Sequence, residues 1–255
     1  MKKAIVYLLI FLGIQMLAGG IVMLIFDLAK IGEGSSFDST KIIVSTAISD
    51  VIILVVFLYA RWAEVSRHWV RTRPWSVLFW CVLAALGALL PSSYLQEELI
   101  PELPNIVEME FEALFNDRLG YFVIGLSGPL VEELVFRGAI LRALLRWRSN
   151  PWIGIVISAV FFSLSHMNPA QMPHAFLIGI LLGWMYYRTD SIVPGVVYHW
   201  VNNTVAYVFS VFYQNPDMEL IELFEGNQRS ELLAVLFSLC ILIPSIVQLN
   251  LRMKK

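Results

Sequence analysis

Three short runs in this sequence place ionisable or amide side chains at spacings of about one helical turn. In chain order they are Glu132-Glu133 with Arg137, Phe162 with His166, and His199 with Asn203. Each run lies inside an apolar stretch. On membrane-insertion scales, an ionised residue at the centre of a membrane helix costs a free energy of about 2.5–3.5 kcal/mol. We therefore expect these side chains to face one another or a polar cavity.

The two glutamates are expected to differ in role. Glu133 and Arg137 are four residues apart, so on a helix they lie on one face and can form an ion pair. Such pairing keeps Glu133 ionised and lowers the desolvation cost of both groups. Glu132 is rotated by about 100° from its neighbour and has no such local partner. An unpaired carboxylate in this setting is suited to act as a general base. The alternative is that both glutamates serve only to hold neighbouring helices together.

The other two runs are individually weaker signals. Phe162 lies one turn before His166, where an aromatic ring packs against an imidazole and restricts its rotamers. His199 and Asn203 share a helix face, and two donors side by side suit a developing oxyanion or a metal with one weak ligand. Read together, the three runs are a much stronger signal of one shared polar site than any of them alone.

Two further ionisable residues inside apolar stretches have no partner at helical spacing. We expect Asp50 to pair locally, and His174, which follows Pro173, to lie at the membrane boundary. Cys81 and Cys240 both lie in apolar runs, so they form neither a disulfide framework nor a thiolate metal site.

The composition shows what must position these residues. The chain is 58% apolar, 13% aromatic and only 15% charged, with a mean hydropathy of +0.71. A soluble domain is about 45–50% apolar and about 25% charged. Disordered chains are poor in aromatic residues and rich in charge. We therefore predict an all-α fold, a polytopic membrane helix bundle with about eight transmembrane helices. It forms a single integral-membrane domain over 1–255, with its catalytic core at 119–205.

Eight segments are long and apolar enough to span a bilayer or nearly so. They are about 4–26, 41–60, 74–91, 119–141, 151–166, 172–187, 191–213 and 231–250. The first is expected to be a retained helix, because its apolar run is too long for a typical cleaved signal peptide. A short surface helix is expected over 105–117, within an acidic stretch.

The loops predict an orientation. With the amino terminus in the cytoplasm, thirteen Lys or Arg residues fall in inner segments and four in outer ones, which is a strong positive-inside bias. Both termini are then cytoplasmic. The basic loop 61–74 resembles a lipid-headgroup patch more than a nucleic-acid site, so we expect the lipid bilayer as a partner and no nucleic acid.

These motifs resemble those of the CPBP intramembrane proteases (CAAX-processing and bacteriocin-processing enzymes, formerly the Abi family), which include the type II CAAX prenyl endopeptidases. Their Glu-Glu-x-x-x-Arg, Phe-x-x-x-His and His-x-x-x-Asn patterns occur here in order, and the linking stretch 183–194 is also similar. The resemblance covers about residues 119–205.

The resemblance implies a role for each motif residue. Glu132 with His166 would activate a water, and His199 with Asn203 would stabilise the tetrahedral oxyanion. Glu133, Arg137 and Phe162 would support the site structurally. The substrate would be a membrane-associated peptide or a lipidated protein, and the setting a bacterial plasma membrane.

The cofactor and some alternatives stay open. Glu132, His166 and His199 could ligate zinc, but a metal-free mechanism is equally compatible, and the His-Glu-x-x-His helix of zincins is absent. The oligomeric state is not predicted. The competing hypotheses are a non-catalytic membrane scaffold or immunity factor and a proton-coupled transporter, since buried Glu and His also serve proton movement.

The predicted depths of two site residues conflict. Glu132 lies ten residues from Arg142, which places it about 15 Å from the cytoplasmic surface. His166, however, closes its predicted span near the outer side. A shared site therefore requires that the span 151–166 be staggered relative to its neighbours.

Overall fold

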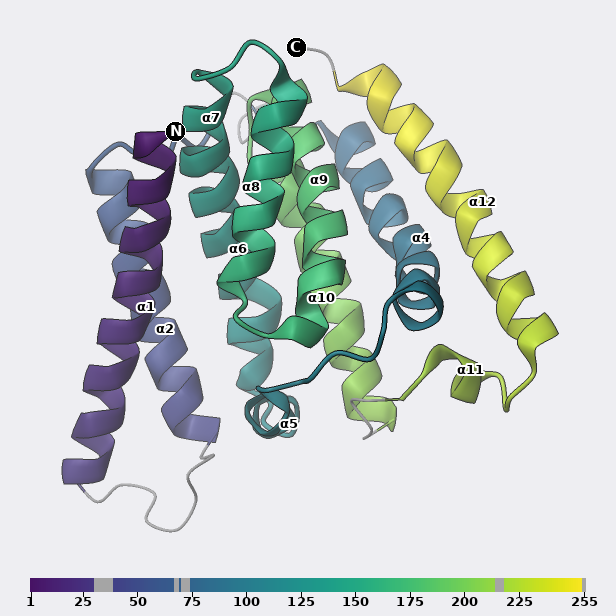
Figure 1. Ribbon diagram of the computed structural model, residues 1–255, viewed down its shortest axis with the longest axis horizontal. Coiled ribbons are helices and arrows are strands. Elements are labelled where there is room, and N and C mark those ends of the chain that lie inside the picture. Colours follow the sequence, from purple (N-terminus) through teal and green to yellow (C-terminus); the bar gives the residue numbers. More distant parts are fainter. Residues whose placement is uncertain (30–38, 67–68, 70–73, 214–217, 254–255) are drawn as a thin grey trace.

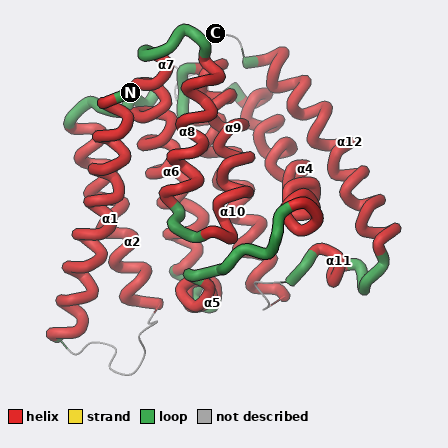
Figure 2. Tube along the Cα trace, viewed as in Figure 1, coloured by secondary structure: helices red, strands yellow, loops and turns green. Residues whose placement is uncertain are grey.

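A computed structural model describes residues 1–29, 39–66, 69, 74–213 and 218–253. Within these ranges the regular structure is entirely helical, without a strand, and short loops join the helices (Figure 2). The predicted all-α class is confirmed.

Helices occur at seven of the eight predicted spans as single elements. They are α1 (Lys2–Leu28), α2 (Ser39–Tyr59), α4 (Trp75–Leu99), α8 (Pro151–Ser165), α9 (Met172–Thr189), α10 (Val193–Tyr213) and α12 (Gln228–Arg252). Shorter elements lie between them, namely α5 (Glu108–Phe115), the 3-10 turn η3 (Pro169–Gln171) and α11 (Leu220–Leu223). The surface helix expected over 105–117 corresponds to α5.

The fourth predicted span is a helix of mixed type that carries both glutamates. It runs through η1 (Phe122–Ser127), α6 (Gly128–Glu133), η2 (Leu134–Leu141) and α7 (Arg142–Leu145), in which η1 and η2 are π-helical. The Gly128 N–H accordingly donates to the carbonyl of Val123, five residues earlier. Pro129 cannot donate a backbone hydrogen bond, so it interrupts the regular ladder here. π-Helical turns are often found at functional sites.

The helices form a central group flanked by two outer pairs (Figure 1). On one side α1 packs along α2, and on the other α4 packs along α12, while α8 packs along α9 in the centre. The two termini lie at one end of the bundle, and α5 and α11 lie at the opposite end.

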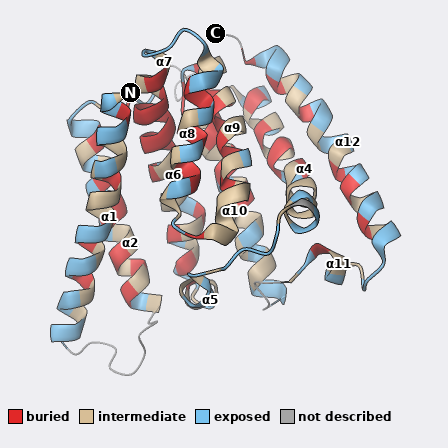
Figure 3. Cartoon of the chain, viewed as in Figure 1, coloured by how far each residue is buried: buried red, intermediate tan, exposed pale blue. Residues whose placement is uncertain are grey.

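The outer pairs have the character of lipid-facing helices. α1, α2, α4 and α12 are each long and apolar enough to cross a membrane, whereas α8 is apolar but shorter. Large apolar side chains on their outer faces are exposed, such as Leu17 on α1 and Phe237 on α12. Buried residues instead concentrate on the central helices (Figure 3). Such broad apolar exposure is typical of a surface that faces lipid.

The short helix α8 resolves the conflict over depth. Its 15 residues span about 22 Å, against about 40 Å for the 27 residues of α1. Asn150 fixes its start, because the side chain accepts from the Trp152 N–H and Pro151 occupies the first turn. His166, the C-cap residue of α8, lines the same cavity as Glu132, so the two residues meet despite their different predicted depths.

The chain turns sharply after His166 and is held there. Met167 has a left-handed backbone, with φ of 52°, which costs a non-glycine residue of order 1 kcal/mol or more. Asn168 follows and is fully buried. Its side chain donates to the Asn105 Oδ1 at 2.9 Å and accepts from the Ile106 N–H at 3.1 Å. The segment that leads from α4 to α5 is thereby fastened beneath the end of α8.

Candidate active site

A buried ion pair lies at the base of the site. The Arg137 NH1 is 2.8 Å from the Glu133 Oε1, and both side chains are almost completely buried. Arg137 also donates to the Gly179 carbonyl on α9 at 3.2 Å. Its guanidinium stacks 4.5 Å from the centre of the Phe162 ring. The pairing predicted from the i, i+4 spacing is therefore present, and it ties the mixed helix to α8 and α9.

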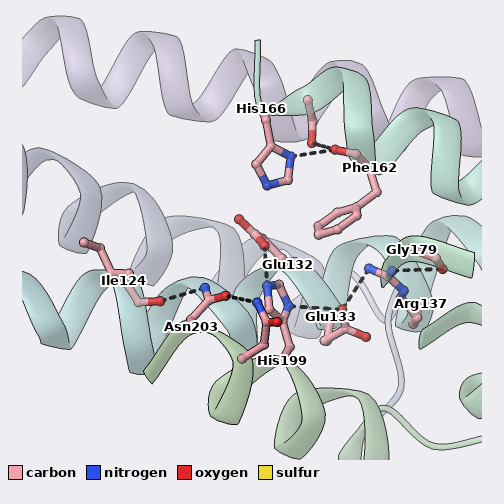
Figure 4. A network of polar contacts seen from close by, with 11 residues as sticks. Ile124, Glu132, Glu133, Arg137, Phe162, His166, Gly179, His199 and Asn203 are labelled. Carbon is pink, nitrogen blue, oxygen red and sulfur yellow. Dashed lines mark hydrogen bonds and ion pairs between the residues drawn. The ribbon is translucent and has the colours of Figure 1, made fainter. Parts of the chain in front are cut away.

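His199 lies between the two glutamates (Figure 4). Its Nε2 is 3.6 Å from the Glu132 Oε2, and its Nδ1 is 3.5 Å from the Glu133 Oε1. Each ring nitrogen thus faces a carboxylate oxygen and can donate toward it. The ring is buried, whereas about a quarter of the Glu132 side chain is exposed. The two glutamates therefore differ in solvent access, as their local pairing predicted.

The second motif forms the opposite wall. Phe162 and His166 pack edge to face with ring centres 4.9 Å apart, which matches the predicted contact. Phe162 also contacts His199 edge to face, at 5.8 Å. The His166 Nδ1 lies 2.9 Å from the Phe162 carbonyl. Because this carbonyl can only accept, Nδ1 carries the hydrogen and Nε2 is left as an acceptor.

Asn203 is held at the other end of the third motif. Its Nδ2 donates to the Ile124 carbonyl at 3.0 Å, and its Oδ1 accepts from the Asn202 side chain at 3.3 Å. One N–H of the amide therefore stays available. The predicted sharing of one helix face by His199 and Asn203 is visible in Figure 4.

A cavity of about 310 Å³ adjoins this network. Its lining residues come from five separate parts of the chain and are Phe11, Gln15, Val107, Glu110, Phe111, Glu132, Ser165, His166 and Gln171. The cavity has room for several water molecules, and its polar groups could hold them. Glu132 and His166 line it directly, while His199 and Asn203 lie behind Glu132.

Several features of the site could not be read from the motifs. Asp50 on α2 does not pair locally; it accepts from the Ser127 hydroxyl at 2.6 Å, across to the mixed helix. His174, in the first turn of α9, lies close enough to His166 and His199 to interact with them electrostatically. Both contacts join helices distant in sequence, for which helical spacing gives no signal.

The possible zinc ligands Glu132, His166 and His199 are not grouped around one point. Among the residues that the structure describes, no three His, Cys, Asp or Glu side chains are grouped so that they could hold a metal ion. Glu132 and His199 approach each other, but His166 faces them across the cavity. A zinc ion bound by all three would require these side chains to move together.

The comparison with known families agrees with the motifs. Residues 115–205 match the family described as type II CAAX prenyl endopeptidase Rce1-like. The matched region starts just before η1 and ends two residues after Asn203. It includes every residue of the three motifs and leaves out the outer helices α1, α2, α4 and α12.

Two curated proteins are similar over part of the chain. The UPF0177 protein YxdF of Lactococcus lactis is 21% identical over 157 residues, which are 58% of this chain and 86% of that protein. The membrane-embedded CAAX protease MroQ of Staphylococcus aureus is 27% identical over 101 residues, which are 38% of this chain and 40% of that protein.

No solved structure matches the chain. The resemblance predicted from the motifs is nevertheless confirmed at the level of the family. Residues 115–205 resemble the Rce1-like CAAX prenyl endopeptidase family, and part of the chain is similar to a membrane-embedded CAAX protease.

Proposed function

We propose that this protein is an intramembrane endopeptidase that hydrolyses a peptide bond in a membrane-associated or prenylated substrate. The observation that carries the proposal is that Glu132 and His166, from two separate helices, line one cavity of about 310 Å³, which has room for several water molecules. The family match over 115–205 supports the same reaction class. The catalytic region is then residues 119–205, within one membrane domain.

The proposed reaction begins with a water in the cavity between Glu132 and His166. Glu132 takes one proton as the water oxygen bonds to the carbonyl carbon, and the acceptor nitrogen of His166 holds the second hydrogen. When the tetrahedral intermediate collapses, the carbon–nitrogen bond breaks and the proton on Glu132 passes to the departing amine. The products are a carboxylic acid and an amine; the acid then loses its remaining proton to solvent as a carboxylate, and Glu132 and His166 return to their starting state.

His199 and Asn203 are proposed to stabilise the oxyanion. The His199 Nε2 faces Glu132 at 3.6 Å, longer than a hydrogen bond, so a substrate oxygen could replace that carboxylate as its partner. The free N–H of the Asn203 amide is the second donor. The other ring nitrogen faces Glu133 at 3.5 Å, and Arg137 holds Glu133, so we propose that this carboxylate orients the ring electrostatically before substrate binds.

The backbone of the substrate must also be freed. Helical carbonyls are hydrogen-bonded within the segment, so a scissile bond in the membrane has to be unwound first. The cavity offers polar groups such as Gln15 and Gln171 as replacement partners. This requirement supports an extended peptide as the bound form.

We also propose the orientation and location predicted from the charges. Both termini lie at one end of the bundle (Figure 1), and Arg142 and Arg188 occupy the same end, paired with Glu64 and with the Met253 carbonyl respectively. By the positive-inside rule this end is cytoplasmic. The matched curated proteins come from bacteria, which supports a bacterial plasma membrane.

The test is cleavage by the purified full-length protein in liposomes. A panel of quenched peptides, including farnesylated tails, is compared for wild type, His166→Ala and His199→Ala, with and without a chelator. We expect wild type to cleave at least one peptide and both variants to lose most of that activity, because each removes a group that contacts water or oxyanion. Loss of wild-type cleavage on chelation would add a metal to the mechanism.

Two results would favour the competing functions. Proton flux across the liposome that His199→Ala abolishes, without peptide cleavage, would indicate a transporter. A biological activity that survives both histidine substitutions would indicate a scaffold. Either result would overturn the endopeptidase proposal.

A further inference from the structure

The cavity contains a second carboxylate for which the proposed reaction has no use. Glu110 projects from α5, in the segment that covers the end of α8, and lines the cavity together with Glu132. Glu110 is half-buried, whereas Glu112 on the same helix is exposed. The cavity lining includes no Lys or Arg. Within the described residues, the Glu110 side chain makes neither an ion pair nor a hydrogen bond that would neutralise it.

The walls beside Glu110 are apolar. Phe11 from α1, with Val107 and Phe111 from the covering segment, line the same cavity. A space with apolar sides and one carboxylate fits a side chain with a methylene stem and a cationic head, since Lys and Arg bury their stems and keep the charge at a polar partner. A purely apolar side chain would leave the carboxylate partly desolvated and unpaired, which is costly.

The position of Glu110 is fixed by the fold. At one end of the covering segment, the Asn168 side chain bonds to both Asn105 and Ile106. At the other end, Asp117 accepts from the Ser39 hydroxyl through its side chain and from the Tyr207 hydroxyl through its carbonyl. The segment that carries Glu110 is therefore held over the cavity by contacts with α2, α10 and the turn after His166.

We propose that Glu110 is a specificity-determining residue that selects a Lys or Arg side chain of the peptide substrate beside the scissile bond. This inference rests on the proposed endopeptidase function, since it names a feature of the substrate for that site. The cation would displace water from Glu110 while its stem packs on Phe11 and Phe111. An acidic side chain at the same position would be repelled by Glu110 and Glu132 together.

The test measures binding separately from cleavage. Full-length protein in phosphatidylcholine nanodiscs, which carry no net lipid charge, is titrated with capped fluorescent hexapeptides of Ala, Leu and Phe. One position at a time is Lys, norleucine or Glu, so that Lys and norleucine differ in charge but share the stem. Hydrolysis of the same peptides is followed in parallel, which keeps failure of the specificity proposal distinct from failure of the endopeptidase proposal.

For wild type, we expect one position at which Lys binds about tenfold more tightly than norleucine, as a charge-assisted hydrogen bond allows. Glu110→Gln should bring this ratio close to one, and Glu110→Lys should make the Glu peptide the preferred ligand. Glu112→Lys is the matched control, because it makes the same charge change on the exposed side of α5. It should leave the ratio unchanged.

Two outcomes would overturn the proposal. One is equal binding of Lys and norleucine peptides by wild type at every position. The other is an equal loss of preference in Glu110→Lys and Glu112→Lys, which would assign the effect to the general charge of this end of the protein. Either can occur whether or not the peptides are cleaved.

Discussion

The central helices and the outer helix pairs differ in which side chains they bury and which they expose. The 18-residue apolar windows of α1, α2, α4 and α12 are only 17–28% buried, so most of their surface is left for lipid. In the centre, Glu133 and Arg137 are almost fully buried, although both are ionisable. Charge is thus confined to the region that protein surrounds. The outer pairs enclose the central helices, which lowers the free-energy cost of placing a polar site in a bilayer.

Breaking the buried ion pair should have the largest effect. Arg137→Met removes the partner of Glu133 and leaves that carboxylate uncompensated, at a cost of about 3–5 kcal/mol. Arg142→Met is the matched control, because Arg142 pairs with Glu64, which is largely exposed, and such pairs contribute about 0–1 kcal/mol. SDS-induced unfolding in mixed micelles measures both. Equal losses would show that the centre is no more sensitive than the rim. Adding Glu133→Gln to Arg137→Met should recover part of the loss.

A smaller effect is expected where an outer helix meets the centre. Asp50→Ala leaves the Ser127 hydroxyl without its acceptor and should cost about 1.5–3 kcal/mol. Asp50→Asn keeps an oxygen that can accept the same hydrogen and should cost less. The same unfolding assay compares the two. If Asp50→Asn were as destabilising as Asp50→Ala, the charge and not the hydrogen bond would be the stabilising feature.

A single added methyl group should distinguish the two regions by activity. A Cβ at Gly195 would lie 2.5 Å from the Glu133 Oε2, whereas at Gly20 on α1 it would meet nothing within 4 Å. Gly195→Ala should therefore displace Glu133 and, with it, His199, and lower the rate of peptide cleavage by about tenfold to a hundredfold. Gly20→Ala should leave the rate unchanged. Steady-state kinetics in liposomes tests the pair, and unaltered cleavage by Gly195→Ala would show that Glu133 does not orient the site.

The smallest effect is expected on the lipid-facing surface. Leu17 on α1 is 69% exposed, while Leu134 in the centre is 1% exposed. Leu17→Ala should change the free energy of unfolding by less than about 0.5 kcal/mol. Leu134→Ala leaves a cavity and should cost about 2–5 kcal/mol. A large loss for Leu17→Ala would mean that this face packs against protein and not against lipid.

Regular patterns made the outer region and the motif helices predictable. Hydropathy located most helices to within a few residues, although α4 continues through Pro91 and ends eight residues beyond the predicted span 74–91. The i, i+4 rule predicted both the Glu133–Arg137 pair and the Phe162–His166 contact. These are local consequences of helical geometry, which the sequence encodes directly. The same rule gave Glu132 no local partner, which left it available to the cavity.

The features of the fold and the site that the sequence did not predict depend on contacts between distant segments. The sequence predicts a short span at 151–166, but not how this span is placed against its neighbours. The bond from Ser127 to Asp50 and the placing of Glu110 over the cavity both result from tertiary packing. Helical spacing carries no information on either of them.

The central claim is that Glu132 activates water in the cavity of the central helices. Its most direct test is single-turnover cleavage of a peptide that wild type hydrolyses, measured in liposomes for wild type and Glu132→Gln, with SDS-induced unfolding as the control for folding. The substitution keeps the shape of a side chain that is already partly exposed. The account predicts normal stability with a cleavage rate lower by about 10²–10⁴-fold. A stable Glu132→Gln protein that cleaves at the wild-type rate would contradict it.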